Sequence, residues 1–148
     1  MEQKYVIIVD LDGTLAEIGH RMHFIRGKGK KDWKGFFSGM SKDPVNVWCR
    51  ELVLAMKASG CEIAVVTGRP DDYQADIDEW LKKHGIPCDR LFTRRAGDFR
   101  PDTVVKREIL YRNFKSNGIL FVVDDRAETV KMWRDEGLTC LQCNPIAS

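Results

Sequence analysis

Three features are missing from this sequence: a long apolar run, a hydrophobic leader and a strong excess of charge. No apolar stretch approaches the roughly 20 residues that a membrane span requires. The first residues also lack the basic and then hydrophobic pattern of a secretory leader. The net charge of the 148 residues is only +2, which does not by itself indicate a nucleic-acid-binding protein. We therefore expect a cytoplasmic protein with no membrane partner, in which any basic surface is local.

Cysteine occurs as an odd, scattered set of five. A chain of this length, with 43% hydrophobic residues, buries a substantial core without disulfide bonds, so we expect reduced thiols. Cys140 and Cys143 form one CxxC motif, and the lack of a second one argues against a four-ligand zinc site. The chain contains no internal repeat, low-complexity tract or linker. Residues 1–148 are therefore expected to form a single domain.

The spacing of apolar residues switches between two periods along the chain. Five dense apolar runs indicate strands, at residues 5–9, 63–66, 90–93, 119–123 and 138–141. Helical spacing between them indicates four helices, at residues 45–55, 73–81, 105–114 and 127–133. This alternation is typical of an α/β fold. Because such crossovers are right-handed, we predict a doubly wound parallel sheet in strand order 3-2-1-4-5, with the first strand central.

Single residues mark the ends and the buried faces of these elements. A glycine follows each predicted helix, where a left-handed cap belongs: Gly60, Gly85, Gly118 and Gly137. Asp102 is expected to cap the start of the helix that follows Pro101. Three tryptophans fall on apolar helix stripes and are expected in the core: Trp48, Trp80 and Trp133.

The segment VIIVDLDGTL, at residues 6–15, carries the most chemical information. Its apolar run suits a strand buried on both faces, so Asp10 falls where the strand leaves the sheet and Asp12 in the turn beyond. Ligands of open α/β sheets bind at the carboxyl ends of the strands. Paired carboxylates there can bind a hard cation and attack phosphorus. The alternative is an ordinary acidic turn after a core strand.

Polar residues also end two other strand-like runs. The runs AVVTGR and FVVDDR place five polar residues and one glycine at strand ends: Thr67, Gly68, Arg69, Asp124, Asp125 and Arg126. Lys106 lies about one turn into the helix after Pro101, within reach of the same edge. Each has a structural alternative, such as a turn residue for Thr67, a capping box with Glu128 for Asp125, or a solvated helix face for Lys106. Their convergence on one edge of the predicted sheet favours an active site.

The series DLDGTL, VVTGR, Lys106 and VVDDR resembles the four signature motifs of the haloacid dehalogenase (HAD) superfamily. It extends from one end of the chain to the other. The GHR after the first motif, the segment 97–106 and the run VVDDRAETVKMWRDEG are similar to the 3'-phosphatase domain of phage polynucleotide kinase-phosphatases. The resemblance is poor over residues 22–44, and we expect a small cap-like insert at about residues 18–44.

The resemblance implies roles for these residues. Asp10 is the expected nucleophile, and Asp12 is the expected general acid and then general base. Thr67 and Lys106 are expected to stabilise the transferring phosphoryl group. One Mg²⁺ is expected on the carboxylates of Asp10, Asp124 and Asp125 and the main-chain carbonyl of Asp12. The residues expected at the substrate are Arg21, Gly68, Arg69, Asp102 and Arg126; among these, Asp102 is placed to orient a cation such as Lys106.

Two basic segments point to the substrate. Residues 20–34 hold six Lys or Arg against one acid, interleaved with Phe24 and Trp33, and residues 90–100 hold four arginines against Asp98. Basic segments with aromatics can follow a nucleic-acid backbone and stack a base, although solvated loops are the alternative. Together with the resemblance, this predicts a Mg²⁺-dependent phosphatase that acts through an aspartyl phosphate on nucleic acid with a 3'-phosphate end, in end repair.

Two other functions stay open. A HAD phosphatase of free nucleotides or another small phosphoester would use the same chemistry, but would more often close a tight apolar cap over its substrate. A phosphoacceptor signalling domain shares the doubly wound scaffold. In such a domain, however, the acidic pair comes first in the sequence, and no second catalytic carboxylate is placed like Asp12. The sequence has no GxxxxGK[ST] motif, so any kinase activity would come from another protein. A separate kinase or ligase of a repair pathway is the expected protein partner.

Overall fold

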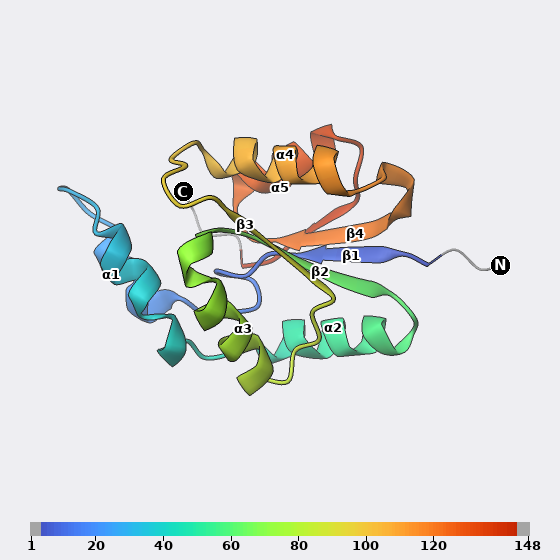
Figure 1. The fold of residues 1–148 in the computed structure, drawn as a ribbon, viewed down its shortest axis with the longest axis horizontal. Helices are drawn as coiled ribbons and strands as arrows, with labels where there is room; N and C mark the ends of the chain where they lie inside the picture. Colours follow the sequence, from blue (N-terminus) through green and yellow to red (C-terminus); the bar gives the residue numbers. More distant parts are fainter. Residues whose placement is uncertain (1–3, 145–148) are drawn as a thin grey trace.

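The computed structural model describes residues 4–144 and confirms the predicted α/β fold. Five parallel strands form one sheet in the order β3-β2-β1-β4-β5, with β1 central (Figure 1). The strands are β1 (Val6–Val9), β2 (Glu62–Pro70), β3 (Arg90–Arg94), β4 (Ile119–Asp124) and β5 (Cys140–Gln142). Each lies within a few residues of its predicted run, except that β2 continues past Val66 to Pro70.

Helices cover both faces of the sheet. Among the described residues the α-helices are α1 (Trp33–Ser38), α2 (Val47–Ala58), α3 (Gln74–Lys83), α4 (Asp102–Asn113) and α5 (Ala127–Asp135). The short 3-10 helices are η1 (Gly19–Phe24), η2 (Met40–Lys42), η3 (Asp71–Tyr73) and η4 (Ser116–Gly118). Figure 1 shows α2 and α3 on one side of the sheet and α4 and α5 on the other. No helix in this part of the chain is both long and apolar enough to cross a membrane.

Two apolar clusters, one on each face of the sheet, hold the layers together. Successive strand residues point to opposite faces, so Ile7 packs in one cluster and Ile8 in the other. Trp80 of α3 lies in the first cluster and Trp133 of α5 in the second, each 1% exposed, as predicted. Because β1 is buried on both faces, polar side chains are costly along it and are placed beyond its end.

The expectation for Trp48 was wrong, because 43% of this residue is exposed. Helix α2 buries Cys49 and Val53, which are four residues apart on one face. Trp48 therefore lies one position away from the stripe that meets the sheet.

Two predicted helix ends also differ. Pro101 holds the N-cap position of α4, and Asp102 is the first helical residue, without a capping hydrogen bond. Gly118 ends a 3-10 helix and lacks the positive φ that was expected, whereas Gly60, Gly85 and Gly137 have it. Gly118 adopts an ordinary conformation because the chain enters β4 directly from η4.

The insert after the first strand forms a small lobe that contains η1, α1 and η2. Its segment WKGFFS forms a single short helix, α1, which the apolar spacing did not predict because six residues are too few to show a period. Phe36 and Met40 anchor the lobe in the core cluster on the α2 and α3 side, at 4% and 1% exposure. Figure 1 shows α1 beyond the carboxyl ends of the central strands. The limits of the insert at 18–44 and the single domain over 1–148 stay predictions.

Two leucines on helices test this account of the core. Leu81 of α3 is 3% exposed, and Leu54 of α2 is 38% exposed. Leu81→Ala should lower the free energy of unfolding by about 2–5 kcal/mol, because it removes buried methyl groups and leaves a cavity. Leu54→Ala should cost less than about 1 kcal/mol. Urea unfolding followed by tryptophan fluorescence measures both, and equal losses would contradict the assignment.

Candidate active site at the carboxyl edge of the sheet

Three carboxylates meet where β1 and β4 end. The amide of Asp10 donates to the carbonyl of Val123 at 3.0 Å, so the first residue after β1 stays tied to β4. Asp124 is the last residue of β4, and Asp125 follows it. One carboxylate oxygen from each of Asp10, Asp124 and Asp125 lies within 4.8 Å of the other two, and all three residues are buried. The sheet therefore joins acids that are more than 110 positions apart in the sequence.

Lys106 of α4 neutralises part of this negative charge. Its Nζ donates to Oδ1 of Asp10 at 2.8 Å and to Oδ2 of Asp124 at 3.0 Å. Burial alone would lower the pKa of Lys106, but the two carboxylates outweigh burial and raise it, so the ammonium stays charged. One ammonium against three carboxylates leaves a surplus of negative charge, and Lys106 lies in the core rather than on a solvated helix face.

Burial and neighbouring charges shift the pKa of all three carboxyl groups. Burial, and then the charge of Asp124, raise the pKa of Asp10 well above its ordinary value. Burial likewise raises the pKa of Asp125. Burial opposes ionisation of Asp124 too, but Lys106 and the indole N–H of Trp133, at 3.1 Å, lower its pKa overall. Buried, oxygen-only donors with excess negative charge suit a hard divalent cation such as Mg²⁺.

Gly13 allows the turn after β1 to approach the acidic pair closely. Its φ is +83°, and a Cβ at this position would lie 2.7 Å from Cγ of Asp125, closer than real contacts permit. Next to it, Oγ1 of Thr14 lies 3.2 Å from both Oδ2 of Asp10 and Oδ1 of Asp125 and can donate to either. The DGT part of the motif therefore shapes the carboxylate cluster, and the residues present fit a bound divalent cation.

Asp12 is bound by two buried arginines and does not join the carboxylate cluster. Arg69 binds its carboxylate through Nε, at 2.9 Å, and through Nη2, and Nη2 of Arg21 donates to it at 2.9 Å. Burial raises the pKa of Asp12, but the arginines, Arg69 foremost, outweigh it and lower the pKa. Nη1 of Arg69 is buried without a hydrogen-bond partner among the described residues. A buried donor of this kind fits an oxygen of a bound anion.

Asp43, at the end of the insert, is a residue that the sequence analysis missed. It is 2% exposed and accepts hydrogen bonds from Nε and Nη2 of Arg21 at 2.7 and 2.6 Å. The carbonyl of Phe36 accepts a further bond from Arg21 at 2.5 Å. Arg21 is therefore buried and fixed in direction, not exposed as part of a basic segment. No sequence motif marks a single acid in the segment of poor resemblance. None marks the hydrogen bonds from Thr14 and Trp133 to the carboxylates either.

A second group of charges surrounds Thr67 and Gly68 in β2. Thr67 is buried, and its Oγ1 accepts from the amide of Arg69 at 3.2 Å. Arg94 donates to the carbonyl of Gly68 at 2.5 Å and pairs with Asp102. A Cβ on Gly68 would come within 3.0 Å of Cγ of Asp102, so only glycine lets them lie this close.

Asp102 also accepts from Nη1 of Arg126 at 2.9 Å. It therefore orients Arg94 and Arg126, and the expectation that it orients Lys106 is not met by a direct bond. Arg126 itself holds the N-cap position of α5, so Asp125 and Glu128 do not form the alternative capping box.

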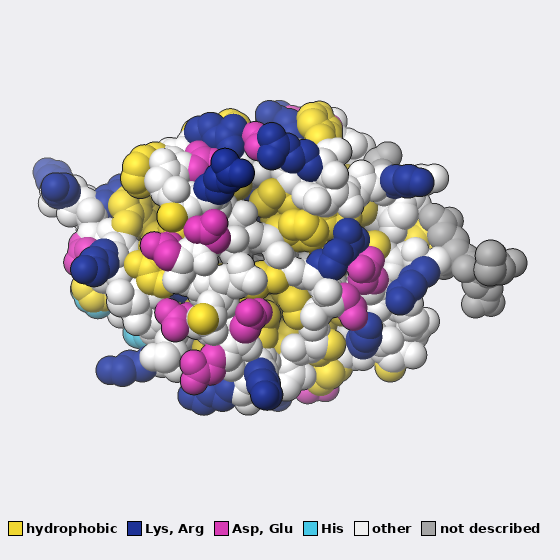
Figure 2. Space-filling view, viewed as in Figure 1, with side chains coloured by type: hydrophobic (Ala, Val, Ile, Leu, Met, Phe, Trp, Pro, Cys, Tyr) yellow, Lys and Arg dark blue, Asp and Glu magenta, His cyan; other side chains and the backbone are white. Residues whose placement is uncertain are grey.

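The two predicted basic segments differ in the structure. In the first, Arg21 is buried, and the exposed cations are Arg26, Lys28, Lys30, Lys31 and Lys34. Figure 2 shows Lys and Arg side chains at the tip of the molecule, over the loop before α1. In the second, three of the four arginines pair inside the domain: Arg90 with Glu62, Arg94 with Asp102 and Arg100 with Asp98. Most of the unpaired positive charge of the two segments therefore lies in the first, while in the second Arg95 is exposed without an ion pair among the described residues.

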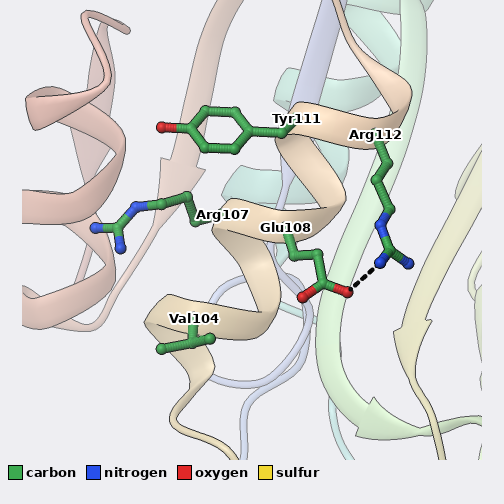
Figure 3. A pocket seen from close by; sticks show the side chains of 5 residues that line it. All are labelled: Val104, Arg107, Glu108, Tyr111 and Arg112. Carbon is green, nitrogen blue, oxygen red and sulfur yellow. Dashed lines mark ion pairs between the residues drawn. The ribbon is translucent and has the colours of Figure 1, made fainter.

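A shallow hollow on the outer face of α4 is separate from these residues. It encloses about 390 Å³ and is lined by Val104, Arg107, Glu108, Tyr111 and Arg112 (Figure 3). Glu108 pairs with Arg112 at 3.1 Å across it. None of the predicted site residues lines this hollow, so it is not part of the carboxylate cluster.

A doubly wound sheet that carries this aspartate, threonine, lysine and acidic-pair set at its carboxyl edge defines a phosphatase domain of the HAD superfamily. The chain matches, over residues 4–146, the family described as the polynucleotide kinase PNKP phosphatase domain, and it belongs to that family. The resemblance inferred from the sequence motifs is thereby confirmed.

Solved structures agree with this assignment. The structure of the Pnkp1/Rnl/Hen1 RNA repair complex contains a chain that is 27% identical, with a TM-score of 0.79 over 97% of this chain and 44% of that one. A second Pnkp1/Rnl/Hen1 complex gives 27% identity and a TM-score of 0.80 over 95% and 46%. The present chain therefore spans less than half the length of these relatives. The HAD hydrolase YfnB from Bacillus subtilis shares the fold, at 12% identity, a TM-score of 0.68 and coverage of 99% and 90%.

Gly13 provides a test of the carboxylate cluster. Gly13→Ala should weaken Mg²⁺ binding and lower phosphatase activity about 100-fold, because the new Cβ displaces Asp125. Gly85→Ala is the matched control, since Gly85 also has a positive φ, +67°, but has open space around its Cβ position. Calorimetric Mg²⁺ titration and phosphate release measure both variants. If Gly85→Ala lost as much binding and activity as Gly13→Ala, backbone strain and not the cluster would be the cause.

Proposed function

We propose that this domain is a Mg²⁺-dependent polynucleotide 3'-phosphatase, which converts 3'-phosphate ends of nucleic acid to 3'-hydroxyls in end repair. The observation that carries the proposal is that two carboxylates beyond β1 lie in different surroundings. Asp10 lies in the cluster with Lys106, at 2.8 Å, while Asp12 is bound by Arg21 and Arg69. Two carboxylates in two environments suit a nucleophile and an acid-base group.

Asp10 is proposed to attack the phosphorus in line. A bond forms from its carboxylate oxygen to phosphorus, and the bond from phosphorus to the 3' oxygen breaks, while Asp12 gives that oxygen a proton. Asp12 then takes a proton from water as the water oxygen attacks the aspartyl phosphate. Inorganic phosphate leaves and the Asp10 carboxylate is restored. Asp12 must be protonated for the first step. We therefore infer that a bound phosphate accepts some of the hydrogen bonds that Arg21 and Arg69 otherwise donate to Asp12.

The carboxylates of Asp10, Asp124 and Asp125 would hold the Mg²⁺, with the main-chain carbonyl of Asp12 as a further ligand. When bound, the cation offsets the repulsion between the Asp10 carboxylate and the phosphate. Lys106 would add a fixed positive charge beside the nucleophile.

The other proposed residues bind and orient the substrate. Thr67 would donate its hydroxyl to a nonbridging phosphate oxygen, and Arg69 would donate Nη1, which is buried without a partner in the described structure. Arg21, fixed by Asp43, would bind the same group. Gly68, Asp102 and Arg126 would contact the substrate beside these groups, and Asp102 accepts a hydrogen bond that sets the direction of Arg126.

The proposed substrate rests on the family and on charge. The two similar chains come from structures of an RNA repair complex, which supports nucleic acid as the substrate and a separate kinase or ligase as a partner. The insert, whose helix α1 lies beyond the carboxyl ends of the central strands, presents exposed cations on the loop before α1, where a polyanion would be attracted.

A panel of substrates tests this proposal. Wild-type protein with Mg²⁺ should release phosphate from a 3'-phosphorylated oligonucleotide at least about tenfold faster, in kcat/KM, than from the 5'-phosphorylated one or from mononucleotides. The reason is that a mononucleotide has no strand to lie along the basic insert, and a 5'-phosphorylated strand would have to lie along it in the opposite direction. Chelation with EDTA should abolish release and added Mg²⁺ should restore it. Preference for mononucleotides would reject the polynucleotide substrate in favour of a small-phosphoester phosphatase.

The variant Asp12→Asn tests the division of roles between the two aspartates. It should reduce turnover by about 100-fold or more and leave phosphate covalently bound to Asp10, because the water that releases it has lost its base. Mass spectrometry of the quenched protein measures the phosphorylated fraction, and Asp135→Asn, on the exposed part of α5, is the control. A wild-type phosphoenzyme that persisted for minutes would instead favour a phosphoacceptor signalling domain.

A further inference from the structure

Aromatic rings of helix α1 lead from Arg69 of the site to the exposed ring of Trp33. The guanidinium of Arg69 lies 5.9 Å from the ring centre of Phe37. The ring of Trp33 lies 5.9 Å from that of Phe37, with an angle of 25° between the two planes. Tyr73, from η3, contacts Phe37 at 5.3 Å. The ring centre of Trp33 therefore lies at most two steps of 5.9 Å from the guanidinium of Arg69.

The ring of Trp33 is held by neighbouring rings and is also partly exposed to solvent. Phe36, which is 4% exposed, meets Trp33 edge-on at 5.9 Å and 88°. Trp33 itself is 47% exposed, although it is held by both phenylalanines. A large indole that is held in place but left open to solvent offers stacking area at little cost in conformational entropy.

Positive charge accompanies the exposed ring. Nζ of Lys31 lies 5.5 Å from the ring centre of Trp33, and Lys28, Lys30 and Lys34 are exposed nearby in the chain. Aromatic rings beside a cationic track are the combination that binds single-stranded nucleic acid, because the cations follow phosphates while the rings stack on bases.

We propose that Trp33 is a specificity-determining residue that stacks on a base among the last four nucleotides of a 3'-phosphorylated strand. This inference rests on the proposed function and names the part of the substrate that is recognised. With the terminal phosphate on Arg69, two steps of 5.9 Å correspond to about three to four stacked nucleotides, since stacked nucleotides are about 3.4 Å apart. Stacking on a ring tolerates every base, so Trp33 selects a polynucleotide over a small phosphoester without reading its sequence.

Substitutions at Trp33 test the proposal. Trp33→Ala should reduce kcat/KM for a 3'-phosphorylated oligonucleotide about 5- to 150-fold, the range found when a stacking aromatic is removed. Trp33→Phe should retain most of the activity, because it keeps a ring. Trp48→Ala is the matched control, since Trp48 is similarly exposed, at 43%, but lies on α2. Hydrolysis of glycerol 2-phosphate, which has no ring, should be unchanged in all three variants.

Oligonucleotides with one abasic site locate the stacked base. When the base at the stacked position is absent, Trp33→Ala should cost nothing further, whereas abasic sites farther from the 3' end should leave its full effect. An unchanged rate of Trp33→Ala on the intact oligonucleotide, or an equal loss on glycerol 2-phosphate, would overturn the inference. The first result leaves the proposed function standing if wild type still prefers the oligonucleotide. A wild type that hydrolyses glycerol 2-phosphate but not the oligonucleotide overturns both.

Discussion

Repulsion among three buried carboxylates is the constraint on which the rest of this site depends. Asp10, Asp124 and Asp125 are held together by the hydrogen bonding of β1 to β4, and Lys106 supplies a single positive charge against them. Such an arrangement is costly in a protein interior. It persists because the parallel pairing of two buried strands and the apolar clusters on both faces position the backbone independently of the charges. Buried oxygen donors with this surplus of negative charge fit a hard divalent cation.

Much of this arrangement could be predicted from the sequence, because it depends on local patterns. Five apolar runs and the helical spacing between them give the sheet order, and parallel strands bring their carboxyl ends to one edge. Asp10, Asp124 and Lys106 therefore had to lie close together once the order 3-2-1-4-5 was inferred. The burial of Trp80 and Trp133 was predicted correctly from helix periodicity. The burial predicted for Trp48 was wrong, because its helix buries the neighbouring stripe of Cys49 and Val53.

What escaped prediction depends on contacts between segments that share no pattern. Asp43 lies in an insert with neither periodicity nor motif, and only the folded lobe brings it to Arg21 at 2.6 Å. The arginines of β3 and the loop after it looked like a basic surface, because a sequence does not show that Glu62, Asp98 and Asp102 pair with them. Asp102, expected to cap a helix, instead binds Arg94 and Arg126.

The charges around the two aspartates divide the site into unlike halves, and this division constrains the chemistry. Around Asp10, three carboxylates face one cation, and the excess of negative charge can bind a divalent ion. Around Asp12, the carboxylates of Asp12 and Asp43 are matched by Arg21 and Arg69, so this half has no surplus to attract a metal. Arg69 still has a buried donor without a partner in the described residues, which suits a phosphate oxygen. Because Arg21 and Asp43 come from the insert, the lobe is electrostatically part of the site.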